Sequence, residues 1–336
     1  MSKFIVPHMM TGNALVPETE GRINLTTFVD IKTLPENAFC NEYYGANLSS
    51  TNELSFPQVE VIDKDNVLAQ VNYNGHGIQT LSFPSLKTIS GNNFLYYAFF
   101  NADLKYVNFP ILINVTGNSV FTYAFSWCMS IENISFPNLK IVSGNSFMTY
   151  ALADCTSLKS ISFPNLETVN GDFLMDYAFR SCNSLKSISF PNLKTVNGNS
   201  FMRGAFGFCT SLENVNFPEL EVVGSDAFYN AFYNCRSFNS ISLPKLKIIK
   251  GYKNFDSAFE DCTSLKSIYF PALTTIQVST DNEYQDGFGA YMLSGVTGCT
   301  VHFPSNLEST LTNSYAVKNG FGGTNTTVLF DLPATS

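Results

Sequence analysis

A unit of 27 residues, shortened to 26 in two places, recurs along most of this chain and limits its fold more than any other feature. The copies are clearest in CTSLKSISFP (155–164), CNSLKSISFP (182–191) and CTSLENVNFP (209–218). A proline closes each copy, at Pro57, Pro84, Pro110, Pro137, Pro164, Pro191, Pro218, Pro244 and Pro271. A period of this length with one fixed apolar pattern indicates a solenoid, because a single coil cannot bury its own hydrophobic face.

Three apolar positions in each copy predict a short strand. Leu158, Ile161 and Phe163 follow the spacing L-x-x-L-x-L, which points all three side chains inward and leaves the polar residues between them facing outward. Pro164 cannot donate a ladder hydrogen bond and is expected to end the strand. We therefore expect a β-rich leucine-rich-repeat solenoid of about ten coils, with the Phe-Pro strands in one parallel sheet in sequence order.

Two columns of small residues mark fixed positions in the coil. Glycine stands six or seven residues after the proline, and alanine follows seven residues later, with phenylalanine after it in all but one copy. The glycines predict positions with positive φ or no room for a Cβ, and the alanines predict a narrow corner. The glycines are Gly91, Gly117, Gly144, Gly171, Gly198, Gly224 and Gly251, and the alanines are Ala98, Ala124, Ala151, Ala178, Ala205, Ala231 and Ala258.

The charge pattern and the hydropathy argue against two kinds of partner. The net charge is −8, and the lysines alternate with glutamates instead of forming the basic stripe that nucleic-acid phosphates require. No stretch approaches the 18 or so consecutive apolar residues of a membrane-spanning helix. We expect neither nucleic-acid binding nor membrane insertion.

Six of the eight cysteines fall in one column, Cys128, Cys155, Cys182, Cys209, Cys235 and Cys262. Stacked coils give these residues parallel Cβ vectors, which suit a disulfide poorly. A column also presents one thiol per coil, whereas structural zinc requires four convergent ligands. The expectation is a buried ladder of reduced thiols, with no metal, no cofactor and no catalytic cysteine.

Three regions are expected along the chain. Residues 1–27 lack the repeat, residues 28–304 carry it, and residues 305–336 suggest a helix, a glycine loop and a last strand that cap the solenoid. The N-terminal residues contain no continuous apolar segment of the kind found in signal peptides. A trimmed signal, or export by another route, would be consistent with that pattern.

The recurring C-x-S-L-x-x-I-x-F-P-x-L-x-x-V, seen from Cys155 to Val169 and followed by Ala178-Phe179, resembles the BspA-like class of bacterial leucine-rich repeats. Members of that family are typically surface-displayed adhesins, and related repeats occur in phage tail and receptor-binding proteins. The resemblance implies a non-enzymatic recognition module that binds a protein or glycan on a host or neighbouring cell. It implies an extracellular or cell-surface location if a signal was trimmed, and a virion if the gene is a phage gene.

An aromatic column is the candidate binding site. Tyr97, Tyr123, Tyr150 and Tyr177 precede the alanine in four consecutive coils, and Trp127 is the only tryptophan. Stacked tyrosines could bind a sugar or a protein partner, since they are large and rigid with a polar tip. They could equally form a packing ladder.

A carbohydrate-cleaving parallel β-helix is the enzyme alternative, because the coil length also suits that fold. Such enzymes need two carboxylates about 5–9.5 Å apart. Asp154 and Asp261 share a column, but four coils separate them, which corresponds to about 19 Å. We therefore expect no catalytic residues.

Overall fold

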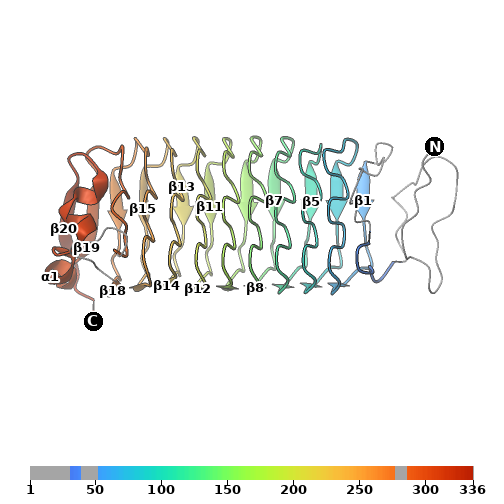
Figure 1. The fold of residues 1–336 in the computed structure, drawn as a ribbon, viewed down its shortest axis with the longest axis horizontal. Helices are drawn as coiled ribbons and strands as arrows, with labels where there is room; N and C mark the ends of the chain where they lie inside the picture. Colours follow the sequence, from blue (N-terminus) through green and yellow to red (C-terminus); the bar gives the residue numbers. More distant parts are fainter. Residues whose placement is uncertain (1–30, 39–51, 277–285, 336) are drawn as a thin grey trace.

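The computed structural model describes residues 31–38, 52–276 and 286–335, which form a solenoid of stacked coils (Figure 1). Figure 1 shows the coils side by side along the long axis, with β1 toward one end and β20 and the short helices at the other. Each typical coil contributes two short strands, and these lie in two separate rows. The predicted β-rich solenoid with parallel strands is therefore confirmed.

The first row consists of the Phe-Pro strands and of the last two strands of the chain. It contains β1 (Glu53–Ser55), β3 (Thr80–Ser82), β5 (Tyr106–Asn108), β7 (Asn133–Ser135), β9 (Ser160–Ser162), β11 (Ser187–Ser189), β13 (Asn214–Asn216), β15 (Ser240–Ser242), β17 (Ser267–Tyr269), β19 (Thr300–Pro304) and β20 (Thr327–Leu332). Pairing within this row is parallel and in sequence order, as predicted. In the described part of the chain, hydrogen bonding divides the row into groups of five, two and four strands, with breaks after β9 and β13.

The second row forms one continuous parallel sheet of nine strands in the described residues. It contains β2 (Val61–Ile62), β4 (Thr88–Ile89), β6 (Asn114–Val115), β8 (Ile141–Ser143), β10 (Thr168–Asn170), β12 (Thr195–Asn197), β14 (Val222–Val223), β16 (Ile248–Ile249) and β18 (Thr275–Ile276). The sequence indicated an apolar run here but not a second sheet. Its strands are two or three residues long, too short to show a clear alternation along the chain.

The core lies between the strand rows and the third side of the coil. The predicted inward residues Leu158, Ile161 and Phe163 are buried, with at most 3% of their surface exposed. Their equivalents stack from coil to coil, so that the ring centroids of Phe136 and Phe163 lie 5.3 Å apart and nearly parallel. Such stacks add specific ring contacts to the burial of apolar area.

The third side of the coil, from the glycine column to the cysteine column, has an unusual backbone that we call the turn face. Every fourth residue there has positive φ, as in Ser146 (57°), Tyr150 (53°) and Asp154 (61°), and the pattern recurs in the other coils. Each such non-glycine residue costs roughly 1–2 kcal/mol. Backbone hydrogen bonds to the next coil offset that cost, for example from Tyr150 N–H to the carbonyl of Asp176 at 2.9 Å.

The glycine column is required for close contact between coils. A Cβ on Gly171 would collide with the carbonyl group of Gly144, and the φ of Gly171 is +131°. Side chains just after the glycines form a ladder that the sequence analysis did not predict. Asn118 N–H donates to Asn92 Oδ1 at 2.8 Å, and the same bond recurs from Asp65 as far as Ser225.

The six column cysteines are buried and free, as predicted. Each thiol donates a hydrogen bond to the carbonyl of the residue after the column alanine in the preceding coil. The Cys155 Sγ, for example, lies 3.1 Å from the carbonyl oxygen of Phe125. Burial raises the pKa of these thiols, to about 12 for Cys128, Cys209 and Cys262. Cys299, outside the column, is also buried and free, whereas Cys40 lies outside the described residues.

Short helices lie between the last two strands. They are η3 (Ser305–Leu307), α1 (Glu308–Leu311), α2 (Tyr315–Lys318) and η4 (Gly320–Gly322). Ser314 caps α2, accepting from Val317 N–H, and its hydroxyl donates to the buried carboxylate of Asp286 at 2.6 Å. This contact joins the helices to the last coils.

The predicted boundaries, 1–27, 28–304 and 305–336, stay a prediction, and residues 1–27 lie outside the described part of the chain. At the other edge of the repeat, Leu34 and Ala38 are buried in the same core as the coils. Among the described residues, no helix has the length and hydrophobicity needed to span a bilayer.

Candidate functional site

The four tyrosines form one continuous stack on the turn face. The ring centroids are 4.4 Å apart for Tyr97 and Tyr123, 4.7 Å for Tyr123 and Tyr150, and 4.8 Å for Tyr150 and Tyr177. The angles between successive ring planes are at most 15°. All four residues have φ between 51° and 53°, so the left-handed backbone gives every ring the same direction.

The stack is half-buried, and three of its phenols are hard to ionise. Burial is the main cause that raises the pKa of Tyr97, Tyr123 and Tyr150, in the last case to about 12. Tyr97, Tyr123 and Tyr150 are therefore neutral at physiological pH and offer hydroxyl groups, not charge, to a partner.

Neighbouring groups cover the outer faces of the stack. Beyond Tyr97, the rings of Tyr73 and Tyr96 lie at centroid distances of 6.1 Å and 4.7 Å. At the other end, the Tyr177 ring lies over Gly204. Because inner rings cover one another, the stack presents ring edges and hydroxyl groups to solvent. It has little free ring face on which a sugar could lie.

A cluster around Arg203, formed with Asp176 and Phe173, adjoins Tyr177 and was not predicted from the sequence. The guanidinium of Arg203 makes two 2.9 Å bonds to the carboxylate of Asp176, and its Cζ lies 5.7 Å from the Tyr177 ring centroid and 5.4 Å from that of Phe173. The Asp176 side chain is only 6% exposed, whereas that of Arg203 is 37% exposed. The spacing of 27 residues between Asp176 and Arg203, one coil, was the available sequence signal.

Trp127 lies apart from the tyrosine stack. It occupies the next positive-φ position after Tyr123, with φ of 64°, and is 43% exposed. In the described part of the chain its ring stacks on none of the four tyrosines. The structure thus brings together four of the five predicted site residues and leaves Trp127 as a separate exposed ring.

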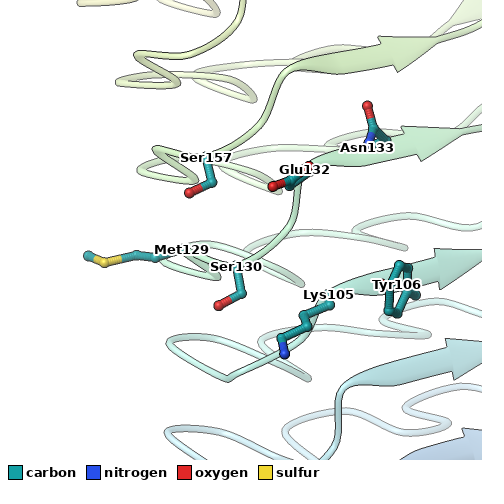
Figure 2. A pocket seen from close by; sticks show the side chains of 7 residues that line it. All are labelled: Lys105, Tyr106, Met129, Ser130, Glu132, Asn133 and Ser157. Atoms are coloured by element: carbon teal, nitrogen blue, oxygen red, sulfur yellow. The ribbon is translucent and has the colours of Figure 1, made fainter.

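A shallow hollow lies where the coils enter the first row of strands (Figure 2). Its volume is about 380 Å³. Figure 2 shows its lining side chains, Lys105, Tyr106, Met129, Ser130, Glu132, Asn133 and Ser157, on the turns and strand starts of successive coils. The hollow was not predicted from the sequence, although a 26-residue spacing occurs in the coil that contains Tyr106.

The described residues contain no cluster of three or more histidine, cysteine or acidic side chains able to hold a metal ion. The two acidic residues of the enzyme alternative, Asp154 and Asp261, both occupy positive-φ positions on the turn face.

A family model described as BspA type leucine-rich repeat region matches residues 92–231 and 175–282, with six copies of the repeat. The chain belongs to this family. The assignment agrees with the parallel strands and the buried columns, and with the resemblance inferred from the repeat.

Solved structures of leucine-rich repeat proteins are also similar to this chain. The leucine-rich repeat protein of T. pallidum is 23% identical, with a TM-score of 0.38, and the match covers 65% of this chain and 81% of that one. A leucine-rich repeat protein from Eubacterium ventriosum is 15% identical, with a TM-score of 0.34, covering 73% of this chain and 82% of that one. A search of the curated proteins gives no match.

Proposed function

We propose that this protein is a non-enzymatic recognition module that binds a protein on the surface of another cell through its turn face. The observation that carries the proposal is the stack from Tyr97 to Tyr177, half-buried and extended by the Arg203 cluster. Tyrosine, tryptophan and arginine are the side chains most enriched at the energetic centres of protein interfaces. The family assignment is consistent with an interaction module.

A protein partner suits this stack better than a sugar does. A sugar ring would need a free aromatic face, and the rings of Tyr123 and Tyr150 are covered on both sides by neighbouring tyrosines. Ring edges and hydroxyl groups can contact side chains and backbone groups of a partner protein. Display on a cell surface or on a virion is part of the proposal, and either location would make the turn face accessible.

Catalysis has no place in this proposal. The carboxylates of Asp154 and Asp261 share a column four coils apart, which corresponds to about 19 Å. Glycoside cleavage needs two carboxyl groups within about 10 Å.

The test replaces Tyr123, Tyr150 and Tyr177 together by serine, the residue found at Ser257 in the same column. Fluorescently labelled protein is incubated with a panel of bacterial and host cells, with and without protease treatment of the cells, and binding is measured by flow cytometry. We expect protease-sensitive binding that the triple variant loses.

A matched control replaces Ser135, Ser162 and Ser189, outward residues of the first strand row, by alanine. This variant should bind as the wild type does. Normal binding by a folded tyrosine variant would show that the contact surface lies elsewhere, and binding that survives protease treatment would argue against a protein partner.

A further inference from the structure

One corner of the solenoid is a residue shorter than its neighbour. It consists of Asp103 alone, between Ala102 and Leu104, whereas the corner of the next coil has two residues, Met129 and Ser130. The corner at Asp103 lies between β3 and β5, so these two strands pair residues that are 26 positions apart. The strands β5 and β7 pair residues that are 27 positions apart. The hollow of Figure 2 lies at this corner, so we attribute it to the space that the missing residue leaves.

Two large side chains at the hollow differ from the small polar residues that occupy most positions of their columns. Tyr106 pairs with Thr80 on one side and Asn133 on the other, and it is 64% exposed. Met129, 48% exposed, stands where the next coil has Thr156. In the described part of the chain, Tyr106 stacks on no other aromatic ring, so its ring is not covered by a neighbouring ring as those of the tyrosine stack are.

Several polar groups at the hollow have unused hydrogen-bonding capacity within the described chain. The ammonium of Lys105 forms no ion pair there, because Glu132 is paired with Lys159 at 2.8 Å and Asp103 is paired with His76 at 3.0 Å. Both of these acidic side chains therefore have other partners.

Among the described residues, two serine hydroxyl groups at the hollow also lack the hydrogen bonds that equivalent serines make in other coils. Those of Ser184 and Ser237 donate to backbone carbonyls of the preceding coil at 2.7 Å. Those of Ser130 and Ser157, in the same column, make no such bond in the described structure. A cation, two hydroxyl groups and an exposed aromatic ring therefore line the same hollow.

We propose that this hollow binds a saccharide that carries a carboxylate, such as a uronic or sialic acid unit of a glycan. The ring of Tyr106 offers an apolar face to the sugar, the hydroxyls of Ser130 and Ser157 meet its hydroxyl groups, and Lys105 pairs with the carboxylate. The site is on a different part of the coil from the tyrosine stack and does not depend on the proposed protein partner.

The experiment measures saccharide binding to the full chain by saturation-transfer NMR and calorimetry. The probes are two acidic saccharides, 3′-sialyllactose and a tetrasaccharide of alternating glucuronic acid and N-acetylglucosamine. Their neutral counterparts are lactose and the same tetrasaccharide with its carboxyl groups reduced to alcohols. We expect an acidic probe to bind with a millimolar-range Kd that weakens with added salt, and its neutral counterpart to bind about tenfold more weakly or not at all.

Three variants test whether the saccharide binds in the hollow. Each introduces a residue type or a corner length that another coil of the repeat already has. Lys105→Gln introduces the residue type that the preceding coil has at Gln79, and it should remove the preference for the acid. Tyr106→Thr introduces the residue type of Thr80, its strand partner, and it should remove binding of both forms. A serine inserted after Asp103 restores the two-residue corner and should abolish binding by filling the hollow.

Matched controls separate this site from other surfaces. Lys186→Gln changes an exposed lysine in the same column away from the hollow and should leave binding unchanged. The triple tyrosine variant should also bind the acidic saccharide normally, even if it loses attachment to cells. The proposal is overturned if neither acidic probe binds, if neutral and acidic forms bind equally, or if Lys105→Gln keeps the preference.

Discussion

The ring of Tyr177 lies over the backbone of Gly204, in the space that a side chain at residue 204 would occupy. The next coil therefore cannot continue the tyrosine stack in its present form, since any Cβ on Gly204 would collide with the Tyr177 ring. Gly204 also has a φ of +59°, which glycine adopts without the strain that the four tyrosines carry. Gly204 therefore ends the tyrosine stack, because its backbone occupies the position next to the Tyr177 ring.

The glycine column permits a test of close packing between coils. Gly171→Ala places a Cβ against the carbonyl of Gly144 at a φ of +131°, whereas Gly298→Ala, at a φ of +70°, meets nothing within 4 Å. We expect Gly298→Ala to lower the free energy of unfolding by about 1 kcal/mol and Gly171→Ala by about 3 kcal/mol or more. Chemical denaturation would measure both, and equal losses would contradict the steric explanation.

The thiol ladder predicts slow labelling in the native state. Burial raises the pKa of Cys128, Cys209 and Cys262 to about 12, so these thiols form little thiolate at neutral pH. Iodoacetamide should leave the six column cysteines unmodified in the folded protein and alkylate all six in denaturant without reductant. Peptide mass mapping distinguishes the sites. A pair that stays protected in denaturant would indicate a disulfide.

The tyrosine stack predicts late ionisation of the Tyr150 phenol. Tyr150 has a pKa of about 12, above the unfolded value of about 10. A raised phenol pKa means that the folded state holds the proton more tightly. Its stabilising contribution is therefore complete below about pH 10 and is lost as the pH rises toward 12.

Ultraviolet titration of phenolate absorbance should resolve a late step that is smaller in Tyr150→Asn. Asparagine occupies this column at Asn230, with a φ of 54°, so the variant keeps the left-handed backbone. The stability of the wild type should also fall more steeply above pH 10 than that of Tyr150→Asn. Ionisation of every tyrosine in one step near pH 10 would be inconsistent with the buried stack.

The Asp176–Arg203 pair predicts asymmetric effects of mutation. Arg203→Thr leaves the buried carboxylate of Asp176 without its partner, and we expect a loss of about 2 kcal/mol, reduced from larger values because Arg203 is partly exposed. Thr122 and Thr149, in the same column, donate to backbone carbonyls, so threonine suits position 176.

The double variant Asp176→Thr/Arg203→Thr should therefore be more stable than Arg203→Thr alone. A double-mutant cycle from urea denaturation would measure the coupling. If the two single losses simply add, the ion pair contributes nothing beyond its separate side chains.

The sequence allowed the coil order, the buried trio and the thiol ladder to be predicted, because each depends on one residue type repeated at one spacing. Leu158, Phe163 and Cys155 repeat in this way. The left-handed positions were not predicted, because the tyrosines among them lack the usual preference of asparagine and glycine for positive φ. Whether a tyrosine face is open or covered depends on the neighbouring coil, which a single column does not show.

The hollow illustrates the same limit. The 26-residue spacing was visible in the sequence, but the side chains around it come from three coils and meet only in the folded chain. In the sequence Tyr106 is therefore one more outward residue of a strand, although in the structure it is far more exposed than any tyrosine of the stack.

The shortened corner at Asp103 has a consequence for a molecule built from near-identical coils. Perfect repetition is a form of translational symmetry, and a ligand that recognises one coil of such an array has as many equivalent binding registers as there are coils. The residue omitted at this corner breaks that degeneracy, because the other 26-residue unit is shortened at a different position of the coil, between Pro218 and Gly224. A partner that recognises this corner is therefore fixed at one position along the solenoid.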